Sequence, residues 1–523
     1  MQRNENSQAA TASAPDMKLF YACFIALVTT AFGFILRAVV LPQWGADFNL
    51  TQTQLGELSG VGLWPFAISI VLFSLIIDRI GYKTAMIFAI LCHISSAVIT
   101  MFATGYWMLY IGTFIVALGN GTVEAVVNPV VATMFPKNKT KWLSILHAGW
   151  AGGLVLGGAM AMMIGQDTAW EYKIALILLP TLLYAFMIFR RRFPLNERVQ
   201  AGVSYREMLQ EVGALGALII IALIVFQLGA VFGWSVTFNT LLTLALTAVF
   251  GWYTRSLGQP LFIILLLIMI PLAITELGTD SWISDLMAPE MGKLGLQGGW
   301  VLVYTSAIMF VLRFFSGPIV HKISPLGLLA VCSAIAALGL YLLSASSGVM
   351  ILVAATIYGL GKTFFWPTML GVVAERFPKG GALTLNITGG LGMIAAGVIG
   401  AGILGFIQDK KIDSNTLAYD QSNNTALHAT YVTEKKTSFF GDYQGLDQSR
   451  LSTATNEEIA AISGIQDTAK KEALRDIVLF PIIMLGSYLL LIFYFRSKGG
   501  YKAVVLKKES AIQREPLLQS LKD

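Results

Sequence analysis

Charged residues are scarce in this chain, since Asp, Glu, Lys and Arg make up only 13% of its 523 residues. Soluble proteins carry about 25% of these four residues. Hydrophobic residues reach 56%, and the mean hydropathy is +0.69, which is more apolar character than a soluble core requires. These values exclude a soluble globular protein and indicate an all-α polytopic membrane protein.

Cysteine is also rare. Cys23, Cys92 and Cys332 lie in apolar runs without the spacing of metal ligands, so neither a disulfide framework nor a zinc site is expected. No nucleophile–base arrangement or phosphate-binding loop stands out in the sequence, which argues against an enzyme. No cofactor is expected beyond a coupling ion, H⁺ or Na⁺. Basic residues lie in short loops between apolar runs and not in a basic domain, so no nucleic-acid partner is expected.

Fourteen apolar segments are long enough to cross a bilayer. They cover residues 17–42, 53–77, 84–103, 106–135, 142–165, 170–189, 212–232, 235–253, 260–286, 299–320, 326–347, 350–375, 382–407 and 477–495. Lys and Arg follow the second, fourth and sixth segments, and these ends are therefore expected in the cytoplasm. This pattern predicts a multi-pass protein of the plasma (inner) membrane with both termini cytoplasmic, functional as a monomer within the lipid bilayer.

An internal repeat divides the chain into halves. Residues 131–137 (VATMFPK) recur as residues 373–379 (VAERFPK), an offset of 373 − 131 = 242 residues. Residues 78–81 align with 321–324, and Leu146-His147 aligns with Leu385-Asn386, at nearly the same offset. Parallel repeats of this kind are typical of transporters, whose binding cavity lies between the halves near the bilayer midplane.

The repeat and the segments together predict six regions. They are an N-terminal tail (1–16), a six-helix bundle (17–192), a cytoplasmic linker (193–211), an extra transmembrane hairpin (212–254), a second six-helix bundle (255–496) with a long external loop (408–476), and a cytoplasmic tail (497–523). The loop is expected to be a solvated insertion, with a lid or a docking surface as the alternative. Its residues 456–476 have the composition of a helix.

Glu124 is the first candidate for a functional residue, because it lies within the apolar stretch 119–136. An ionisable residue inside a membrane usually faces a partner or a water-filled cavity. The repeat places Glu124 opposite Trp366 and places Arg37 near Asp280. Arg37 is expected to pair with Glu124 or Asp280, or else to hold an anionic solute. A purely structural ion pair remains the alternative for Glu124.

Further candidates come from the second half. Glu276 and Asp280 are four residues apart, so they share one helix face and can take up a proton or a sodium ion. Lys362 is the cation expected to neutralise one of them. His147 and Asn386 are candidates for hydrogen bonds to solute hydroxyls, or for helix packing. Trp150 and Trp366 are candidates for stacking on a sugar ring, or for interfacial anchoring.

Residues 74–83 (SLIIDRIGYK) resemble the signature of the major facilitator superfamily, Gly-x-Leu-x-Asp-Arg-x-Gly-Arg-Lys, with Ser74 and Tyr82 as departures. The resemblance implies two pseudo-symmetric six-helix bundles, here with an extra hairpin between them. It also implies a cytoplasmic gating latch. The residues assigned to the latch are Asp78, Arg79, Gly81 and Lys83, with Arg313 in a degenerate counterpart (RFFSG, 313–317) in the second half.

Glu124, Asn128 and Pro129 resemble the Glu-x-x-x-Asn-Pro motif of the fucose–proton symporter branch of this superfamily. In that branch the glutamate handles proton and sugar, and the resemblance carries this role over to Glu124 and Asn128. The branch commonly has an aspartate in the first helix, where this chain has Arg37 and Ala38.

The resulting prediction is a secondary active transporter, not an enzyme. The expected solute is a monosaccharide, moved by alternating access with a proton or sodium gradient. One alternative is a transporter or exchanger of organic anions that uses Arg37 and Lys362 as counter-charges. A remote alternative is a membrane sensor that uses the external loop.

Overall fold

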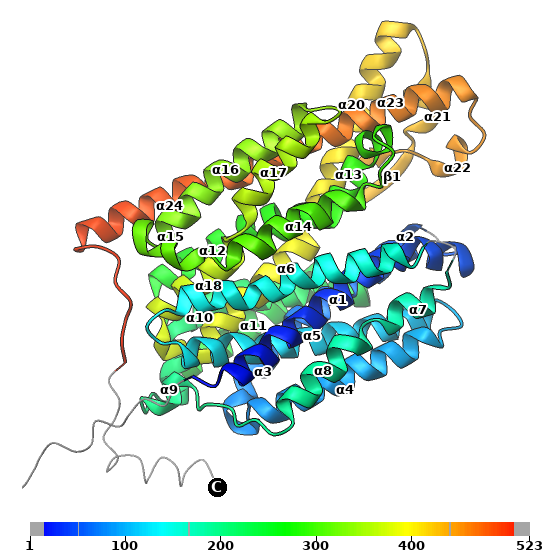
Figure 1. Cartoon of the computed structure of the whole chain (residues 1–523). Helices are drawn as coiled ribbons and strands as arrows, with labels where there is room; N and C mark the ends of the chain where they lie inside the picture. The colour runs from blue at the N-terminus through cyan, green and yellow to red at the C-terminus, as the bar shows by residue number, and fades with distance from the viewer. Residues whose placement is uncertain (1–14, 51, 166–167, 439–440, 507–523) are drawn as a thin grey trace, which may run out of the picture.

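Long helices make up nearly all of the structure (Figure 1). The computed structural model describes residues 15–50, 52–165, 168–438 and 441–506. Within these ranges, thirteen helices are long and apolar enough to cross a membrane, and a further apolar helix, Gly299–Arg313, is shorter. Each of the fourteen predicted segments overlaps one of these helices. The predicted class, an all-α polytopic membrane protein, is confirmed.

The first half contains eight helices, and two of its six spans are built from helix pairs. They are α1 (Met17–Asp47), α2 (Gln52–Gly60), α3 (Trp64–Ile80), α4 (Tyr82–Met101), α5 (Tyr106–Met134), α6 (Lys139–Met163), α7 (Trp170–Ala175) and α8 (Leu178–Ile188). Pro65 lies in the first turn of α3, where a missing N–H does no harm. Gly81 separates α3 from α4 with φ +80°, a conformation that favours glycine.

The second half has interrupted spans. Its elements are α12 (Pro260–Ala273), the π-helical turn η1 (Ile274–Gly278), α13 (Thr279–Lys293), α14 (Gly299–Arg313), α15 (Ser316–Ile323), α16 (Pro325–Ala345), α17 (Met350–Lys362), α18 (Phe365–Arg376), the 3₁₀ turn η2 (Pro378–Gly380), α19 (Gly381–Ile394), the π-helical turn η3 (Ala395–Gly400), α20 (Ala401–Asn423) and α24 (Leu479–Ser497). Interruptions lie in the span that carries Glu276, in the span that carries Lys362 and Trp366, and in the span that carries Asn386.

A short helix and a pair of long helices connect the halves. They are α9 (Glu197–Gln200), α10 (Tyr205–Phe232) and α11 (Val236–Thr254). Ser204 and Glu207 form a capping box that starts α10 before the predicted membrane segment, and Gly213, with φ +60°, breaks the helix near the predicted boundary. α10 and α11 pack along each other, and α10 also contacts α12 and α19 of the second half.

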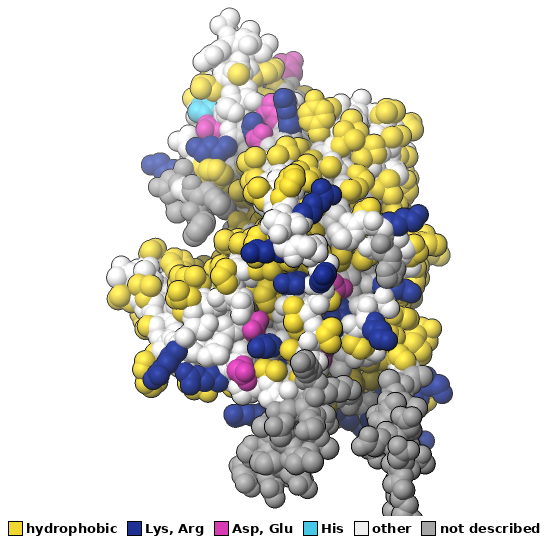
Figure 2. All heavy atoms as spheres, turned by 90° about the vertical axis from the view of Figure 1, so that its left-hand side faces the viewer, with side chains coloured by type: hydrophobic (Ala, Val, Ile, Leu, Met, Phe, Trp, Pro, Cys, Tyr) yellow, Lys and Arg dark blue, Asp and Glu magenta, His cyan; other side chains and the backbone are white. Residues whose placement is uncertain are grey.

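The halves meet along several helix pairs. α6 packs against α14 and α18, and α3 and α5 pack against α19. In Figure 1 the first half lies below and the second half above, with their helices running in similar directions. Figure 2 views the end at which α9 lies and α24 finishes, and Lys and Arg side chains are spread over this face with few Asp and Glu among them. We call this face the basic end.

The segment predicted as an external loop is folded. α20 continues to Asn423 and is followed by α21 (Leu427–Tyr431), strands β1 (Glu434–Ser438) and β2 (Gly441–Gly445), α22 (Gln448–Leu451) and α23 (Asn456–Ile477). β1 and β2 pair antiparallel. The predicted helix is present as α23, and a capping box of Thr455 and Glu458 starts it. A separate small core explains why a polar segment folds; it includes Ile412, Leu427, Tyr431, Val432 and Ile462.

One ion pair attaches α23 to α13, and a second pair lies within α13 itself. Glu290 Oε1 lies 2.7 Å from Lys471 Nζ and 3.0 Å from Lys293 Nζ. The hydrogen bond from Lys471 is the main cause that lowers the pKa of Glu290 below its ordinary value near 4.5. A carboxylate with a lowered pKa stabilises the folded arrangement above the ordinary pKa, and this contribution is lost as the pH falls through the lowered value.

We therefore expect α23 to loosen from α13 in acid, and Lys471→Gln to loosen it already at neutral pH. Hydrogen exchange of the α23 amides measures this, with an expected increase of about fivefold for an interaction of about 1 kcal/mol. Lys435→Gln, an exposed lysine on β1, is the matched control. Equal hydrogen exchange of the α23 amides in Lys471→Gln and in the unchanged protein would show that the ion pair of Glu290 with Lys471 does not hold α23 against α13.

Candidate functional site

A small cavity lies where the two halves meet. The first half contributes Phe66, Glu124, His147 and Trp150, and the second contributes Glu276, Leu277, Arg313, Trp366 and Met393. The volume of the cavity is about 20 Å³, which is enough for a water molecule and too little for a solute of monosaccharide size. Binding of such a solute therefore requires movement of the helices that line the cavity.

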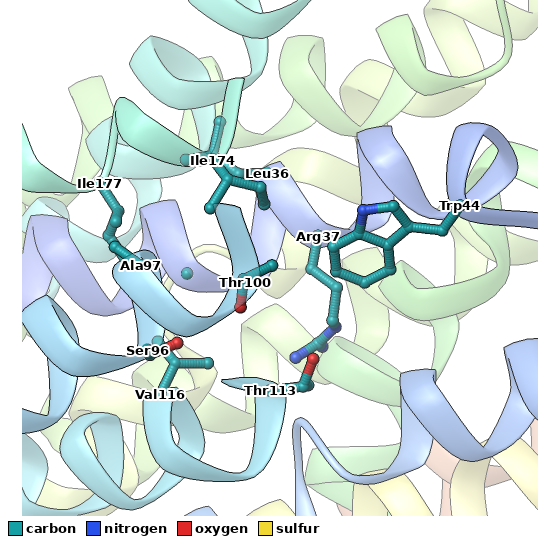
Figure 3. Close-up of a pocket in the computed structure, with 11 residues that line it drawn as sticks. Leu36, Arg37, Trp44, Ser96, Ala97, Thr100, Thr113, Val116, Ile174 and Ile177 are labelled. Carbon is teal, nitrogen blue, oxygen red and sulfur yellow. The ribbon is translucent and has the colours of Figure 1, made fainter. Parts of the chain in front are cut away.

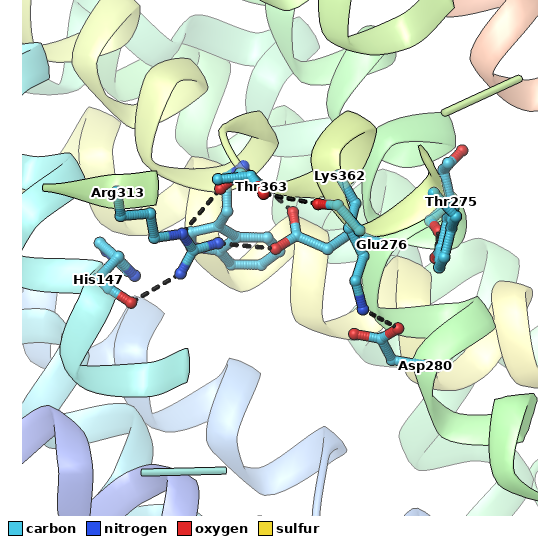
Figure 4. Close-up of polar contacts among 10 residues, drawn as sticks. His147, Thr275, Glu276, Asp280, Arg313, Lys362 and Thr363 are labelled. Atoms are coloured by element: carbon cyan, nitrogen blue, oxygen red, sulfur yellow. Dashed lines mark hydrogen bonds and ion pairs between the residues drawn. The ribbon is translucent and has the colours of Figure 1, made fainter. Parts of the chain in front are cut away.

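Arg313 is the centre of the polar contacts in this cavity (Figure 4). Its Nε donates to the Thr363 carbonyl (2.8 Å), its Nη1 to the His147 carbonyl (2.7 Å) and its Nη2 to Glu276 Oε1 (3.1 Å). The side chain is only 1% exposed. Since His147 belongs to the first half, one guanidinium joins both halves. Sequence resemblance assigned Arg313 to the gating latch, but the structure places it in the central cluster, because it ends the membrane helix α14 and does not lie in the following loop.

Glu276 lies in the π-helical turn η1. Its second oxygen, Oε2, accepts a hydrogen bond from the Trp366 backbone N–H (3.2 Å). Pro271 lies just before this turn and lacks an N–H for the regular helix ladder. Gly278 at the end of η1 lies against Gly400 at the end of η3, so close that a Cβ on Gly278 would be 3.4 Å from the Gly400 Cα. π-helical turns are frequent at functional sites, and here two of them meet beside the cavity.

Asp280 forms a second buried ion pair, with Lys362. Lys362 Nζ lies 2.5 Å from Asp280 Oδ1, and the two side chains are 0% and 6% exposed. Lys362 also lies over the Tyr358 ring, 5.1 Å from its centroid. Asp280 and Glu276 therefore each have a basic partner, Lys362 and Arg313. A sodium ion held between the two carboxylates would compete with both of these pairs.

Glu124 has an amide partner in place of a cation. Asn128 Nδ2 donates to Glu124 Oε2 (2.5 Å), and Asn128 Oδ1 lies 3.0 Å from His147 Nε2. Asn386, the repeat counterpart of His147, donates to the Ala125 carbonyl (3.0 Å). Both repeat-related residues thus reach α5 from neighbouring helices. Among the described residues, no basic group lies within ion-pair distance of Glu124.

Both candidate tryptophans lie in the lining of the cavity. Trp366 is 6% exposed and packs its ring against Gly392 of α19. Trp150 is partly buried and lies 5.9 Å from the Phe34 ring, centroid to centroid. Both rings can therefore border a solute that enters between the halves.

Arg37 is absent from this cavity. It lines another cavity inside the first half, with residues of α4 and α5, and it forms no ion pair within the part of the chain that the structure describes. The predicted pairs of Arg37 with Glu124 or Asp280 are therefore wrong. The Arg37 side chain is turned into its own bundle and away from the interface of the halves.

The latch residues gather at the basic end. Asp78 Oδ2 lies 2.5 Å from Arg198 Nη2, so the partner of this aspartate comes from α9 in the linker. Lys83 donates to the Phe189 carbonyl (2.9 Å), and the Arg79 guanidinium lies 5.9 Å from the Tyr205 ring centroid. The contacts of Asp78 and Arg79 fix the linker to the first half, and that of Lys83 joins α4 to the end of α8 within the first half.

Other contacts at the basic end cross from one half to the other. Lys139 Nζ donates to the Ala374 carbonyl (3.1 Å) and forms an ion pair with Glu197 (2.5 Å). Thr140 Oγ1 donates to Glu375 Oε1 (2.6 Å). The linker and both halves are thus joined here, and these bonds must break if the cavity is to open toward the basic end.

We expect Asp78→Asn to weaken this closed arrangement, because it removes a charged hydrogen bond worth about 1.5–3 kcal/mol. The labelling rate of a cysteine introduced at Ala374, which is buried here beside Lys139, should rise about tenfold in a protein without its native cysteines. Arg190→Gln changes an exposed charge at the same end and is the control. A labelling rate that is unchanged in Asp78→Asn would contradict a latch function.

Sequence reasoning missed several contributors to these sites. Arg198 lies in a polar linker without periodicity, so nothing in the sequence indicated its partner. The Thr363 carbonyl and the Trp366 N–H are available because the span breaks between α17 and α18, and Pro367 was the only local signal for that break.

Comparison with known proteins gives a family and a fold. The model of the Major Facilitator Superfamily matches residues 23–282. A gentisate transporter of Corynebacterium glutamicum is 22% identical over 35% of this chain and 41% of its own length. The sialic acid transporter NanX of Escherichia coli is 25% identical over 32% of this chain and 42% of its own length. The chain thus matches about two fifths of the length of these relatives.

Solved structures match far more of the chain. The human organic anion transporter MFSD10 has a TM-score of 0.61 at 12% identity and covers 91% of this chain and 99% of its own. The fucose:proton symporter FucP of Escherichia coli has a TM-score of 0.52 at 15% identity, with coverage of 89% and 98%. At these identities the likeness establishes the fold alone.

Proposed function

Because the chain belongs to the major facilitator superfamily, we propose that it is a secondary active transporter that moves a small polar solute by alternating access, together with protons. The similar proteins named above are described as transporters or symporters, which favours transport over enzymatic catalysis or sensing. By the positive-inside rule the basic end faces the cytoplasm of a plasma membrane.

The charge balance around the cavity carries the proposal. Glu124, Glu276 and Asp280 are three carboxylates, while Arg313 and Lys362 supply two positive charges, and all five side chains are buried. An unbalanced charge inside a membrane is costly, so the cluster is neutral when one carboxylate holds a proton. Glu124 has no basic partner among the described residues and is the natural site for that proton.

The same balance favours a solute that carries a carboxylate. Arg313 presents a guanidinium, which binds carboxylates in a bidentate geometry, and Glu276 occupies one of its nitrogens (3.1 Å). A solute carboxylate that displaces Glu276 adds a negative charge, and a second proton then restores neutrality. Solute and proton together favour a state that neither stabilises alone. The transport of organic acids by several relatives is consistent with this class.

A monosaccharide is the second candidate. The observation that favours it is the lining of the cavity, where Trp150 and Trp366 offer ring faces and Glu124 and His147 offer hydrogen-bond groups. Aromatic faces suit the apolar faces of sugar rings. The fold likeness to fucose and xylose symporters is compatible with a sugar but does not specify one.

Thermal unfolding of the purified protein distinguishes these candidates, since a ligand of the native state raises its stability. Gentisate, cis,cis-muconate and sialic acid form one set, and fucose and xylose the other. We expect stabilisation by a member of the acid set, greater at low pH, and loss of this effect in Arg313→Gln. Stabilisation by the neutral sugars alone would overturn the carboxylate class and favour the second candidate.

A further inference from the structure

A second cavity, separate from the central one, lies inside the first six-helix bundle (Figure 3). Its volume is about 30 Å³, and its polar lining comes from α1, α4 and α5. The side chains that matter are Arg37 and Trp44 of α1, Thr100 of α4 and Thr113 of α5. Every one of them can donate a hydrogen bond, and no carboxylate lines the cavity.

Arg37 is a buried cation without a counter-charge. It is 7% exposed, and within the described residues it forms neither an ion pair nor a hydrogen bond. Its one recorded partner is the Phe34 ring, whose centroid lies 5.7 Å from the guanidinium carbon. Figure 3 shows the guanidinium extended beyond Trp44 toward Thr113. A bare charge in this setting is strongly unfavourable, so the site requires a negative partner.

Trp44 borders the cavity with its ring. The side chain is 1% exposed, and its indole N–H is buried without an acceptor among the described residues. In Figure 3 the indole nitrogen lies on the edge of the ring away from the Arg37 guanidinium. The ring therefore closes one side of the cavity, and Arg37 is the charged donor that faces it.

The two threonines complete the lining. The hydroxyls of Thr100 and Thr113 form no hydrogen bond within the described chain, whereas the neighbouring Ser96 already donates to the Gly112 carbonyl (2.6 Å). Thr100 Oγ1 lies so close to Gly112 that a Cβ atom on Gly112 would be only 2.2 Å from this oxygen. Gly62 makes similar room for Arg37, since a Cβ at Gly62 would lie 1.6 Å from Nη1. Glycines therefore leave space for both polar groups.

We propose that this cavity binds a chloride ion, held by the Arg37 guanidinium with the hydroxyls of Thr100 and Thr113 as further donors. A lining of donors selects an anion, and one positive charge balances a monovalent one. The volume accepts a species of about the size of a water molecule and excludes an organic acid. The ion joins α1, α4 and α5, so it stabilises the first bundle and is distinct from the transported solute.

Thermal unfolding of the purified full-length protein tests the proposal without any transport assay. The apparent melting temperature is compared in sodium chloride, sodium bromide and sodium gluconate at equal ionic strength. We expect a saturable rise of about 1 °C or more with chloride and bromide over gluconate. Arg37→Gln should abolish the difference between the salts, and Thr113→Val should shift its midpoint to about tenfold more chloride.

Two further variants separate the site from general folding effects. Gly62→Ala keeps the charge of Arg37 but occupies the position of its guanidinium, and it should lose the chloride response. Arg190→Gln removes an exposed charge at the basic end and should keep it. Equal melting temperatures of the unchanged protein in chloride and gluconate would overturn the proposal, as would a full chloride response in Arg37→Gln.

Discussion

Arg313→Gln is expected to abolish transport and to destabilise the protein by about 3–5 kcal/mol, the usual effect of removing one partner from a buried ion pair. The change leaves the buried Glu276 without its cation and removes hydrogen bonds to the carbonyls of Thr363 and His147. Because His147 lies in the other half, the variant also loses a direct bond between the halves. Uptake into proteoliposomes and thermal unfolding measure the two effects.

Two companion variants separate charge from geometry. Arg313→Lys keeps the positive charge but cannot form three hydrogen bonds in fixed directions. We therefore expect a stability between those of Arg313→Gln and the unchanged protein, and a transport rate at least about a hundredfold lower than normal. The double variant Arg313→Gln with Glu276→Gln restores the charge balance and should recover much of the stability without transport. Transport near the normal rate in either variant would show that Arg313 is structural and that the solute binds elsewhere.

The second large effect is expected for Glu124→Gln. The change removes the one carboxylate of the cluster that has no basic partner among the described residues and keeps a hydrogen-bond acceptor for Asn128, which in turn contacts His147. Affinity for the solute should change little, whereas accumulation against a solute gradient, driven by a pH gradient, should fall about a hundredfold. Exchange of labelled for unlabelled solute should persist, because exchange needs no net proton movement.

Glu211→Gln is the matched control for this experiment. Glu211 is also a buried carboxylate, 8% exposed, but it lies on α10 beside Gln259 and outside the cavity. We expect normal accumulation in this variant. If Glu124→Gln and Glu211→Gln behaved alike, the loss would reflect the removal of any buried carboxylate and not proton coupling at Glu124.

The geometry also suggests how the site communicates with the rest of the protein. Glu276 is held in a π-helical turn that contacts a second one through Gly278 and Gly400. Such turns absorb changes in helix register. If Glu276 released Arg313, the change would therefore reach the two spans that contain these turns. These spans are near the hydrogen bond that Arg313 makes to the His147 carbonyl of the other half.

The sequence predicted the helices well because span length and hydropathy depend on local composition alone. Side-chain partners were harder. The pairing of Lys362 with one of two carboxylates followed from helical spacing, and the structure contains that pair with Asp280. The predicted partners of Arg37 failed, because a position along a helix does not fix the rotation of that helix in its bundle.

The external segment shows a second limit of sequence reasoning. Its apolar residues are too few and too widely spaced for a membrane span, so composition indicated a solvated loop. They nevertheless form a small core of their own, with Ile412, Leu427 and Ile462 among its members. The Thr455 cap matches the local pattern Thr-x-x-Glu and could have been predicted, whereas the ion pair of Glu290 with Lys471 joins residues far apart in the sequence.

The most direct test of proton coupling is a pH measurement inside proteoliposomes. A solute identified by the thermal screen is added outside, with no initial pH gradient, while a trapped fluorescent dye reports the internal pH. Coupling through the cluster around Glu124 and Arg313 predicts acidification of the interior by the unchanged protein and none by Glu124→Gln. Solute uptake at the full rate without any change of internal pH would contradict it.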